Sequence, residues 1–384
     1  MKQKKQLNRW KDDRPAGNYF LYVVTATLLL ASCQKEGTPP ARGNNEGALH
    51  KQSSRAPDLV VHPGGSIQAA LNSANAGATI KIQAGTYQES ITVNKPGITL
   101  RGDGEVTLQN PGGATIGINV EDAADGFSLD HITVRDFEER GVQINHVDGF
   151  VLSHVTVINN GEFGLFSEYC QNGLIEHCEG RGHAETAVFV GQSSHVAITR
   201  SRGYDNVIGF EVENSSDVSL DRNHAYNNAV GMMCLLVPGR LTGESSRISL
   251  TKNEIRQNNH PNFSQPPEAE SVLPTGIGIL LLGVNQTEVR DNRVTDNQFT
   301  GVAVVSTLLM AALANLPPEA FESIEPNPDG VTVISNFVKG NGTIPPAGLP
   351  FPGADLLWDG SGTGNCWGKN LYLTSYPSAL PACQ

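Results

Sequence analysis

The hydrophobic and polar positions of this 384-residue chain repeat every 22 to 24 residues over most of its length. Short alternating runs such as GVQIN, GLFSE and GFEVE begin at small residues that lie 22 or 23 positions apart, namely Gly141, Gly164, Ala187, Gly209 and Gly231. A second set of runs, including FSLDH, FVLSH and VSLDR, recurs at the same interval. Strict alternation over so few residues is typical of half-buried β-strands. Each period therefore predicts two or three short strands separated by turns rich in Gly, Asn and Asp.

A unit of this length cannot bury its own apolar face, so each unit must stack on the next as one coil of a solenoid. Asparagines recur just before the strand that follows, at Asn160, Asn206, Asn227, Asn228, Asn259 and Asn297. We expect them to stack and to hydrogen-bond buried backbone groups. A leucine-rich horseshoe would need leucines at fixed spacing and a helical return, and neither is present. The pattern predicts an all-β, single-stranded parallel β-helix.

Two departures from the repeat predict a cap and a set of insertions. Residues Ile67, Ala70, Leu71 and Ala74 lie on one face of a predicted helix that precedes the strand at 78–87. Such a helix would cap the first coil. The repeat is interrupted at 238–245, 260–274 and 308–328, where loops are expected to emerge and to wall a binding groove. Within the last insertion, the run from Leu308 to Leu313 predicts a short helix that packs on the coils.

Alternation also predicts which side chains point outward in the runs that begin with Gly or Ala. The inward set is Val142, Leu165, Val188, Phe210 and Met232. Stacking then aligns two outward rows, which we call the aromatic–acidic strip: Gln143, Phe166, Phe189, Glu211 and Met233 in the first, and Asn145, Glu168, Gly191, Glu213 and Leu235 in the second. We expect this strip to be exposed to solvent, although a merely solvated sheet face is the alternative.

The chemistry of the strip indicates sugar binding, because aromatic faces flanked by carboxylates and amides are typical of such sites. The predicted substrate-binding residues are Phe166, Glu168, Tyr169, Glu185, Phe189, Gln192 and Asn214. The predicted catalytic residues are Glu211, Glu213 and His183. Two carboxylates two residues apart on a strand are about 6 to 7 Å apart, a spacing that does not select between retention and inversion. Such a pair can also hold a calcium ion, the one cofactor we consider.

The N-terminus has the layout of an export signal. Six basic residues lie among residues 1–14, and an apolar stretch from Tyr19 to Leu30 follows. The sequence Leu30-Ala31-Ser32-Cys33 resembles the bacterial lipobox, which implies that 1–33 is a lipoprotein signal peptide and that Cys33 carries the lipid. By the same resemblance, Gln34 is compatible with the outer membrane. Residues 34–58 are predicted to form a flexible tether, and 59–384 the β-helix domain.

Charge excludes one class of partner. The signal region holds six basic and two acidic residues, which leaves 21 basic and 37 acidic residues on the rest of the chain. A body this acidic repels a polyanion unless a cation intervenes, so we do not expect a nucleic-acid ligand.

The six cysteines predict one covalent link and no metal centre. In an exported chain, Cys366 and Cys383 are expected to form a disulfide that holds the C-terminal tail. Cys170 and Cys178 lie at opposite ends of one extended segment, about 26 Å apart at 3.3 Å per residue, which is beyond disulfide reach. No CxxC pair or CxxCH motif occurs, so neither a zinc site nor covalent haem is predicted.

These features together resemble the right-handed parallel β-helix class of pectate lyases, pectin esterases and alginate epimerases. A narrower resemblance, from Gly164 to Cys383, is to an uncharacterised group of exported β-helix lipoproteins. It rests on Gly191-Gln192-Ser193, Asn206-Val207, Asn258-Asn259, Asn262-Phe263 and the run from Asp355 to Gly360. This chain has Leu236 and Glu185 where relatives tend to carry aspartate. The group is often encoded beside an exported c-type cytochrome-like protein, which implies such a partner.

The resemblance leaves several functions open. A lyase of this fold uses Lys or Arg with calcium, but the strip holds no lysine, and the Asp-Pro-His triplet of alginate epimerases is absent. Asp130-His131 resembles that triplet in composition only, and we expect His131 to be a ladder residue. A hydrolase that uses Glu211 with Glu213 fits the chemistry better. The alternatives are a protein that only binds polysaccharide and a scaffold that docks the cytochrome-like partner.

Overall fold

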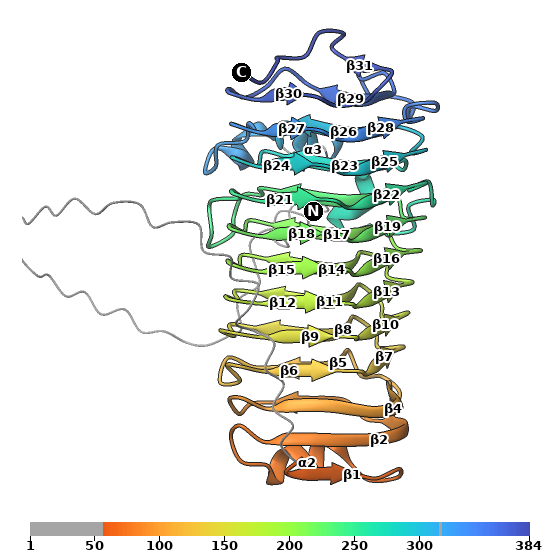
Figure 1. Ribbon diagram of the computed structural model, residues 1–384, viewed down its shortest axis with the longest axis vertical. Helices are drawn as coiled ribbons and strands as arrows, with labels where there is room; N and C mark the ends of the chain where they lie inside the picture. The colour runs from red at the N-terminus through yellow and green to blue at the C-terminus, as the bar shows by residue number, and fades with distance from the viewer. Residues whose placement is uncertain (1–56, 267, 315–316) are drawn as a thin grey trace, which may run out of the picture. The chain divides into compact units, whose positions relative to one another are not determined.

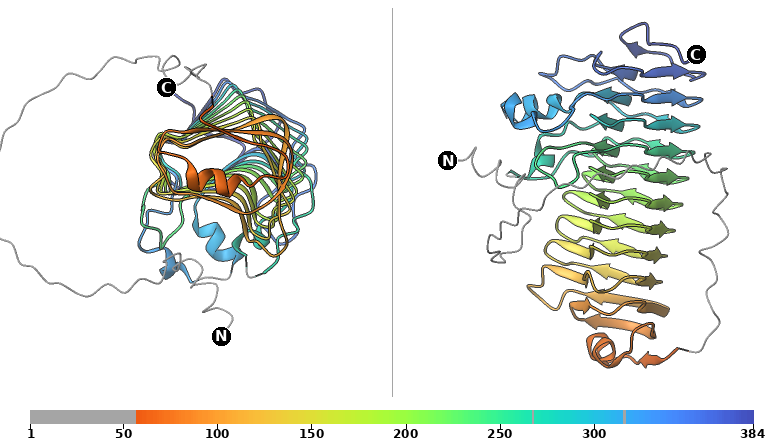
Figure 2. Two further views of the ribbon diagram at one scale, coloured as in Figure 1. Left: turned by 90° about the horizontal axis from the view of Figure 1, so that it is seen from below. Right: turned by 90° about the vertical axis from the view of Figure 1, so that its left-hand side faces the viewer.

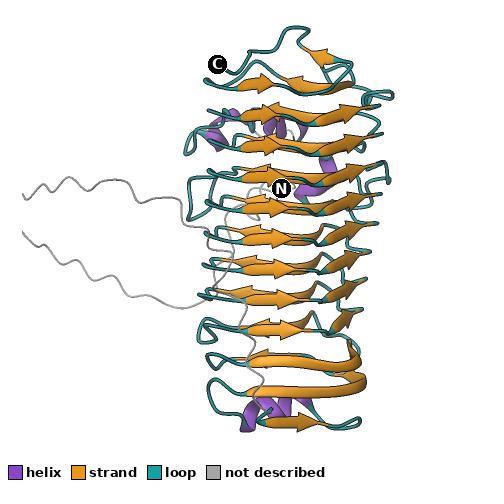
Figure 3. Ribbon diagram, in the orientation of Figure 1, coloured by secondary structure: helices purple, strands orange, loops and turns teal. Residues whose placement is uncertain are grey.

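The computed structural model describes residues 57–266, 268–314 and 317–384. The expected signal peptide, Cys33 and most of the tether fall outside this part of the chain. Within residues 57–384, short parallel strands stack coil upon coil along one axis (Figure 1). Figure 3 shows that helices are confined to one end and to the insertions. This architecture confirms the predicted all-β parallel solenoid.

One side of each coil belongs to an 11-stranded parallel sheet, which we call sheet B. Its strands, in spatial order, are β3 (Ile91–Val93), β5 (Ile116–Val120), β8 (Arg140–Asn145), β11 (Phe163–Glu168), β14 (Thr186–Gly191), β17 (Ile208–Glu213), β20 (Val230–Leu235), β23 (Ile277–Leu282), β26 (Thr300–Val305), β29 (Ala354–Trp358) and β31 (Ser375–Tyr376).

The other two sides form a 20-stranded sheet, which we call sheet A. Its first row contains β1 (Leu59–Val61), β6 (Ser128–Asp130), β9 (Val151–Ser153), β12 (Leu174–Glu176), β15 (Ala197–Thr199), β18 (Ser219–Asp221), β21 (Ser249–Thr251), β24 (Glu288–Arg290), β27 (Thr332–Ile334) and β30 (Cys366–Gly368). Its second row contains β7 (Thr133–Arg135), β10 (Thr156–Ile158), β13 (Glu179–Arg181), β16 (Arg202–Tyr204), β19 (His224–Tyr226), β22 (Glu254–Arg256), β25 (Arg293–Thr295) and β28 (Phe337–Lys339). The long strands β2 (Thr79–Gln88) and β4 (Thr99–Gln109) span both rows.

The chain turns sharply between the two rows of sheet A. One residue at each of these turns has a positive φ, a conformation in which Asn, Asp and His are enriched among residues other than Gly. In five successive coils these residues are His131 (φ 55), His154 (φ 53), His177 (φ 52), Arg200 (φ 50) and Arg222 (φ 56). The turn therefore stacks side chains of like position along the solenoid.

Aliphatic and aromatic side chains fill the inside of the coils. All five residues predicted to point inward are buried there: Val142, Leu165, Val188, Phe210 and Met232. The predicted cap is also present, because helix α2 (Ile67–Ser73) lies across the first coil and buries Ile67 and Leu71 in the same core (Figure 2). The side chain of Ser66 accepts a hydrogen bond from the amide of Ala69 and so caps this helix.

Buried polar ladders satisfy the backbone at the corners. In one ladder, each Asn side chain accepts a hydrogen bond from the amide of its counterpart one coil earlier, through Asn206, Asn228, Asn258, Asn297 and Asn341. A second ladder runs through Ser201, Asn223, Asn253, Asn292, Asn336 and Asn370. Asn227 and Asn259 do not belong to these ladders. The side chain of Asn227 donates to Asp205, whereas that of Asn259 donates to the carbonyl of Asp296 and accepts from the amide of Gln298. Ladders of this kind give every turn the same register.

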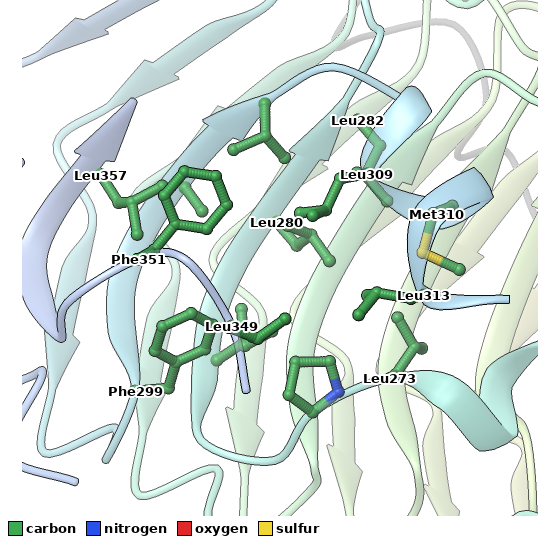
Figure 4. Close-up of a pocket in the computed structure, with 14 residues that line it drawn as sticks. Leu273, Leu280, Leu282, Phe299, Leu309, Met310, Leu313, Leu349, Phe351 and Leu357 are labelled. Carbon is green, nitrogen blue, oxygen red and sulfur yellow. The ribbon is translucent and has the colours of Figure 1, made fainter. Parts of the chain in front are cut away.

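The insertions cover part of the outer surface of sheet B. Helix α3 (Leu308–Leu313), at the predicted position, and the 3₁₀ helices η1 (Ala269–Val272) and η2 (Pro318–Phe321) belong to them. Leu273, Met310, Leu349 and Phe351 pack against outward residues of sheet B such as Leu280 (Figure 4). The space between them is a cavity of about 20 Å³, with room for roughly one water molecule. This end of sheet B is thus a second apolar core and not a ligand pocket.

The C-terminal tail is fixed to the last coil. Cys366 and Cys383 form a disulfide, as the sequence indicated. Cys170, Cys178 and Cys234 are buried and unbonded to one another. Burial raises the pKa of the Cys170 thiol to about 12, so it is not a reactive thiolate.

Candidate functional site

The two outward rows of the aromatic–acidic strip pair in the predicted register. Gln143, Phe166, Phe189, Glu211 and Met233 are Cα partners across β8, β11, β14, β17 and β20. The second row, from Asn145 to Leu235, pairs in the same way two residues further along each strand. Sequence periodicity therefore placed these side chains on the correct face.

The expectation that this face is exposed is wrong. Phe166 and Phe189 are each only 4% exposed, and Glu211 is 2% exposed. The two rings stack on each other at a centroid distance of 4.8 Å, and Phe163 meets both edge-on. The guanidinium carbon of Arg140 lies 4.0 Å from the centre of the Phe166 ring. The aromatic residues thus form a compact cluster with a cation over it, which a pattern of alternation alone does not reveal.

The insertion at 238–245 is attached to the strip by hydrogen bonds and an ion pair. Nε of Arg240 lies 2.8 Å from a carboxylate oxygen of Glu213. The backbone amide of Leu241 donates to the side-chain oxygen of Gln192 over 2.7 Å, and Gln192 donates to Glu168 over 2.8 Å. The side chain of Asn214 donates to the carbonyls of Val237 and Thr242, and it accepts from the Val237 amide. Gln192 and Asn214 therefore hold this loop in place.

Glu211 and Glu213 have different surroundings although they lie on one strand. Glu211 is fully enclosed and accepts a hydrogen bond from the hydroxyl of Thr186. Burial raises the pKa of Glu211 well above its ordinary value, and the negative charges of Glu270 and Glu213 raise it further. Glu213 instead faces the guanidinium of Arg240. A carboxyl group with a raised pKa beside an ion-paired carboxylate is an arrangement that can serve acid–base chemistry.

More carboxylates gather where the insertion at 260–274 meets the strip. Carboxylate oxygens of Glu162, Glu185 and Glu268 lie within 4.8 Å of one another. Oxygen ligands of this type suit calcium. Glu185 was predicted for this region, whereas Glu162 and Glu268 were missed. Glu162 lies one period before Glu185 and could have been found, but the fold of an insertion cannot be read from a repeat.

His183, which was predicted to be a catalytic residue, lies in a structural position inside the coil. Its side chain is fully buried, its Nδ1 donates to the carbonyl of Asn160 over 2.8 Å, and its amide donates to the side chain of Asn206. His183 therefore occupies the place that asparagine takes in neighbouring coils of the first ladder. Burial lowers the pKa of this imidazole to about 4, and the charge of Arg181 acts in the same direction, so it stays neutral near pH 7.

The turn that follows sheet B carries the accessible part of the site. His146 and Tyr169 occupy the same position in adjacent coils, both with positive φ, and their rings stack at 4.5 Å. His146 is exposed and Tyr169 is half-buried. They lie directly after Asn145 and Glu168 of the strip, so this aromatic pair forms its rim. Tyr169 was predicted as a binding residue, and His146 was not.

The sequence predicted no zinc site and offered calcium only the carboxylates of the strip. In the described residues, two groups of side chains lie close enough to share an ion: the glutamates already described, and Asp130 with His131 and His154. Both groups combine residues from successive coils. One-period spacing between ligands is the signal that could have found them.

Residues 116–237 match the family model described as right handed beta helix region. Among solved structures, the A-module of mannuronan C-5 epimerase AlgE4 from Azotobacter vinelandii is similar, with a TM-score of 0.56 and 16% identity over 80% of this chain and 94% of that chain. The A-module of AlgE6 from the same organism has a TM-score of 0.57 and 13% identity over 80% and 92%. No curated protein sequence matches the chain. The repeat, the coils and these matches show a right-handed parallel β-helix.

Proposed function

We propose that this right-handed parallel β-helix protein binds an extracellular or envelope polysaccharide at the outer surface of sheet B, around β8, β11, β14 and β17. One observation carries the proposal: a stacked aromatic rim, His146 and Tyr169, lies beside the carboxylate and amide pair Glu168 and Gln192. Aromatic rings offer flat apolar surfaces to sugar rings, while carboxylates and amides accept and donate hydrogen bonds to hydroxyl groups.

The proposed surface is limited to the first half of the solenoid. From β20 onward the outward residues of sheet B are apolar, and the insertions pack over them. Around β8 to β17 the outward residues include Gln143, Phe166, Glu168 and Glu211. A ligand would first meet the rim, and access to the buried carboxylates requires the loop at 238–245 to move away from Gln192 and Glu213.

The charge of the site favours a ligand that binds together with a cation. The two similar structures are A-modules of mannuronan C-5 epimerases, and mannuronan is an acidic polysaccharide. The cluster of Glu162, Glu185 and Glu268 would repel such a chain, but a calcium ion held there would bridge it to the protein.

The experiment is an array of acidic and neutral polysaccharides probed with the full chain, with calcium or with a chelator. We expect binding to at least one polysaccharide class, with acidic chains bound only in the presence of calcium. Absence of binding to every class, under both conditions, would contradict the proposal.

A second candidate function is hydrolysis at the same surface, and it is favoured by the contrast between Glu211 and Glu213. A raised pKa suits Glu211 to donate a proton to a leaving group, as glycoside hydrolases require. Release of reducing ends from the bound polysaccharide that is lost in Glu211→Gln would support it. A rise in absorbance near 235 nm would instead indicate a lyase. The absence of both signals would indicate a protein that binds polysaccharide without cleaving it.

For location, we propose that the chain is exported and anchored through a lipid on Cys33, with the outer membrane as its destination. The basic N-terminus and the lipobox-like sequence support this proposal. Within the described residues, no helix has the length and apolar character needed to cross a membrane. Fractionation of cells that express Cys33→Ser tests the anchor: release into the soluble fraction supports it, and continued tight membrane association contradicts it.

A scaffold that docks an exported c-type cytochrome-like partner through the same surface is the alternative to polysaccharide binding. The two can be separated by purification from the native envelope. A partner that copurifies and is displaced by substitutions of the rim, with no polysaccharide bound, would favour docking.

A further inference from the structure

We propose that Asp130, His131 and His154 form a binding site for one divalent transition-metal ion such as Zn²⁺, separate from the strip. The three residues lie at the turn between the two rows of sheet A, in two successive coils, whereas the strip lies on sheet B. The proposal does not depend on the polysaccharide function.

The donor atoms converge on one point. Nδ1 of His131 lies 2.6 Å from Oδ1 of Asp130, and Nδ1 of His154 lies 3.7 Å from the same oxygen. All three donor atoms lie within 4.8 Å of one another. In a tetrahedral zinc site with bonds of about 2.0 to 2.2 Å, neighbouring ligand atoms are roughly 3.3 Å apart. Small side-chain movements are enough to bring these three atoms to that spacing.

The ligand types select the class of metal. Two imidazole nitrogens with one carboxylate oxygen suit zinc and neighbouring transition metals, while calcium and magnesium prefer oxygen ligands alone. Three protein ligands leave at least one coordination position for water or another small ligand.

The fold brings these residues together through its register. Asp130 pairs with Ser153 across β6 and β9, so the residues that follow, His131 and His154, occupy the same turn one coil apart. Their rings stack at a centroid distance of 4.4 Å with an interplanar angle of 15°. Because the lone pair of an imidazole lies in the ring plane, each ring must turn about its Cβ–Cγ bond to coordinate a shared ion.

Exposure allows that rotation while the carboxylate stays fixed. The side chains of His131 and His154 are 55% and 46% exposed, whereas the Asp130 side chain is 7% exposed. The site thus combines a buried carboxylate with two imidazoles that are open to solvent.

A second group of contacts would orient the ligands. The hydroxyl of Ser153 lies 2.9 Å from Nδ1 of His154 and donates to Glu176 over 3.2 Å. His177 stacks on the far side of His154 at 5.0 Å, outside the group of donor atoms. Later coils place Arg200, Arg222 and Lys252 at this turn, and these cations cannot bind a metal ion. The site is therefore limited to the coils that carry histidine.

The test uses the full chain, stripped with a chelator and titrated with ZnCl₂ by calorimetry, with bound zinc counted after dialysis. We expect one Zn²⁺ per chain, and a loss of affinity of at least about tenfold in His131→Gln and in His154→Gln, because changes even to outer-shell residues cost about 10- to 100-fold. His195→Gln is the matched control: His195 is also exposed and also has a positive φ, of 57, but it lies at another turn. We expect its affinity to be unchanged.

Three titration results would overturn the proposal: no zinc bound by the full chain, wild-type affinity in both histidine variants, or an equal loss of affinity in His195→Gln. Asp130→Asn is not needed for the decision, because its buried position makes it the variant most prone to misfold. X-ray absorption at the zinc edge gives an independent reading. Two imidazole ligands with oxygen would support the site, and an all-oxygen shell would place the ion on the glutamates instead.

Discussion

Arg240 and Glu213 form the ion pair that joins the loop at 238–245 to strand β17, with 2.8 Å between the guanidinium Nε and a carboxylate oxygen. Their side chains are 19% and 8% exposed. Removal of one partner of a buried pair leaves the other charge uncompensated, so we expect Arg240→Ala to lower the free energy of unfolding by about 3 kcal/mol.

The matched control for this change is Arg222→Ala, which removes an ion pair with Asp221 whose side chains are 45% and 27% exposed. An exposed pair contributes at most about 1 kcal/mol. Thermal and denaturant unfolding of both variants measures the difference. Similar small effects in the two would show that Arg240 does not hold the loop.

The stability of the folded chain should depend on pH through Glu211. Its pKa is raised in the folded state by burial and by Glu270 and Glu213, from an ordinary value of 4.5. The folded chain therefore binds more protons than the unfolded chain above that pH, so stability falls as pH rises from about 4.5 toward the folded pKa. Glu211→Gln removes this dependence.

The measurement is the melting temperature of wild type and Glu211→Gln at a series of pH values from 4 upward. We expect the wild type to lose stability relative to the variant as pH rises, while contributions from other groups cancel in the difference. A difference that is constant with pH would contradict the account of Glu211.

His183 is predicted to have a structural role that asparagine can replace. His183→Ala removes the donor to the Asn160 carbonyl, which should cost about 1 to 3 kcal/mol because a buried acceptor is left without its partner. His183→Asn should cost less, since the amide can join the ladder as in neighbouring coils. Denaturant unfolding compares the two, and polysaccharide binding should be unchanged in His183→Asn. Loss of binding or turnover in a stable His183→Asn variant would contradict a purely structural role and would support a role for His183 in the site.

The sequence was sufficient to predict the coils, but it did not show which outward side chains other groups bury. A period of 22 to 24 residues placed Val142 and Leu165 inside and Phe166 and Glu211 outside, because stacked coils repeat one environment at every period. It could not show that Phe166 is buried, because that burial depends on tertiary contacts such as the Arg140 guanidinium.

The same limit applies to the histidines. The sequence around His183 predicts a turn just before the strip. In the structure, the His183 side chain occupies the position that asparagine side chains take in the first ladder. His131 was expected to be a ladder residue, and it does stack on His154, but its approach to Asp130 depends on side-chain orientation. Register follows from the repeat, whereas burial and side-chain direction depend on insertions and neighbours.

The disulfide between Cys366 and Cys383 closes a segment with a sequence separation of 17. A loop of about 15 residues corresponds to roughly 3 kcal/mol of stabilisation in the chain-entropy model. We expect the double variant Cys366→Ser, Cys383→Ser to lose about this much in the last coil alone, because each coil of a solenoid contacts only its neighbours. Amide hydrogen exchange should show faster exchange in β30 and β31 and unchanged exchange in β11 and β14. Uniform loss of protection along the chain would contradict a local role.

The most direct test of the central claim compares two stacked aromatic pairs on different faces of the solenoid. His146→Ala with Tyr169→Ala removes the rim of the strip, where the rings stack at 4.5 Å, and Tyr204→Ala with Tyr226→Ala removes a stack of 4.9 Å on sheet A. The dissociation constant of each double variant for the polysaccharide that the full chain binds is measured by calorimetry. The account predicts at least about tenfold weaker binding for the rim variant, since an aromatic contact of about 1.5 kcal/mol corresponds to a factor of ten, and unchanged binding for the sheet A variant. Unchanged binding in the rim variant, or loss only in the sheet A variant, would contradict it.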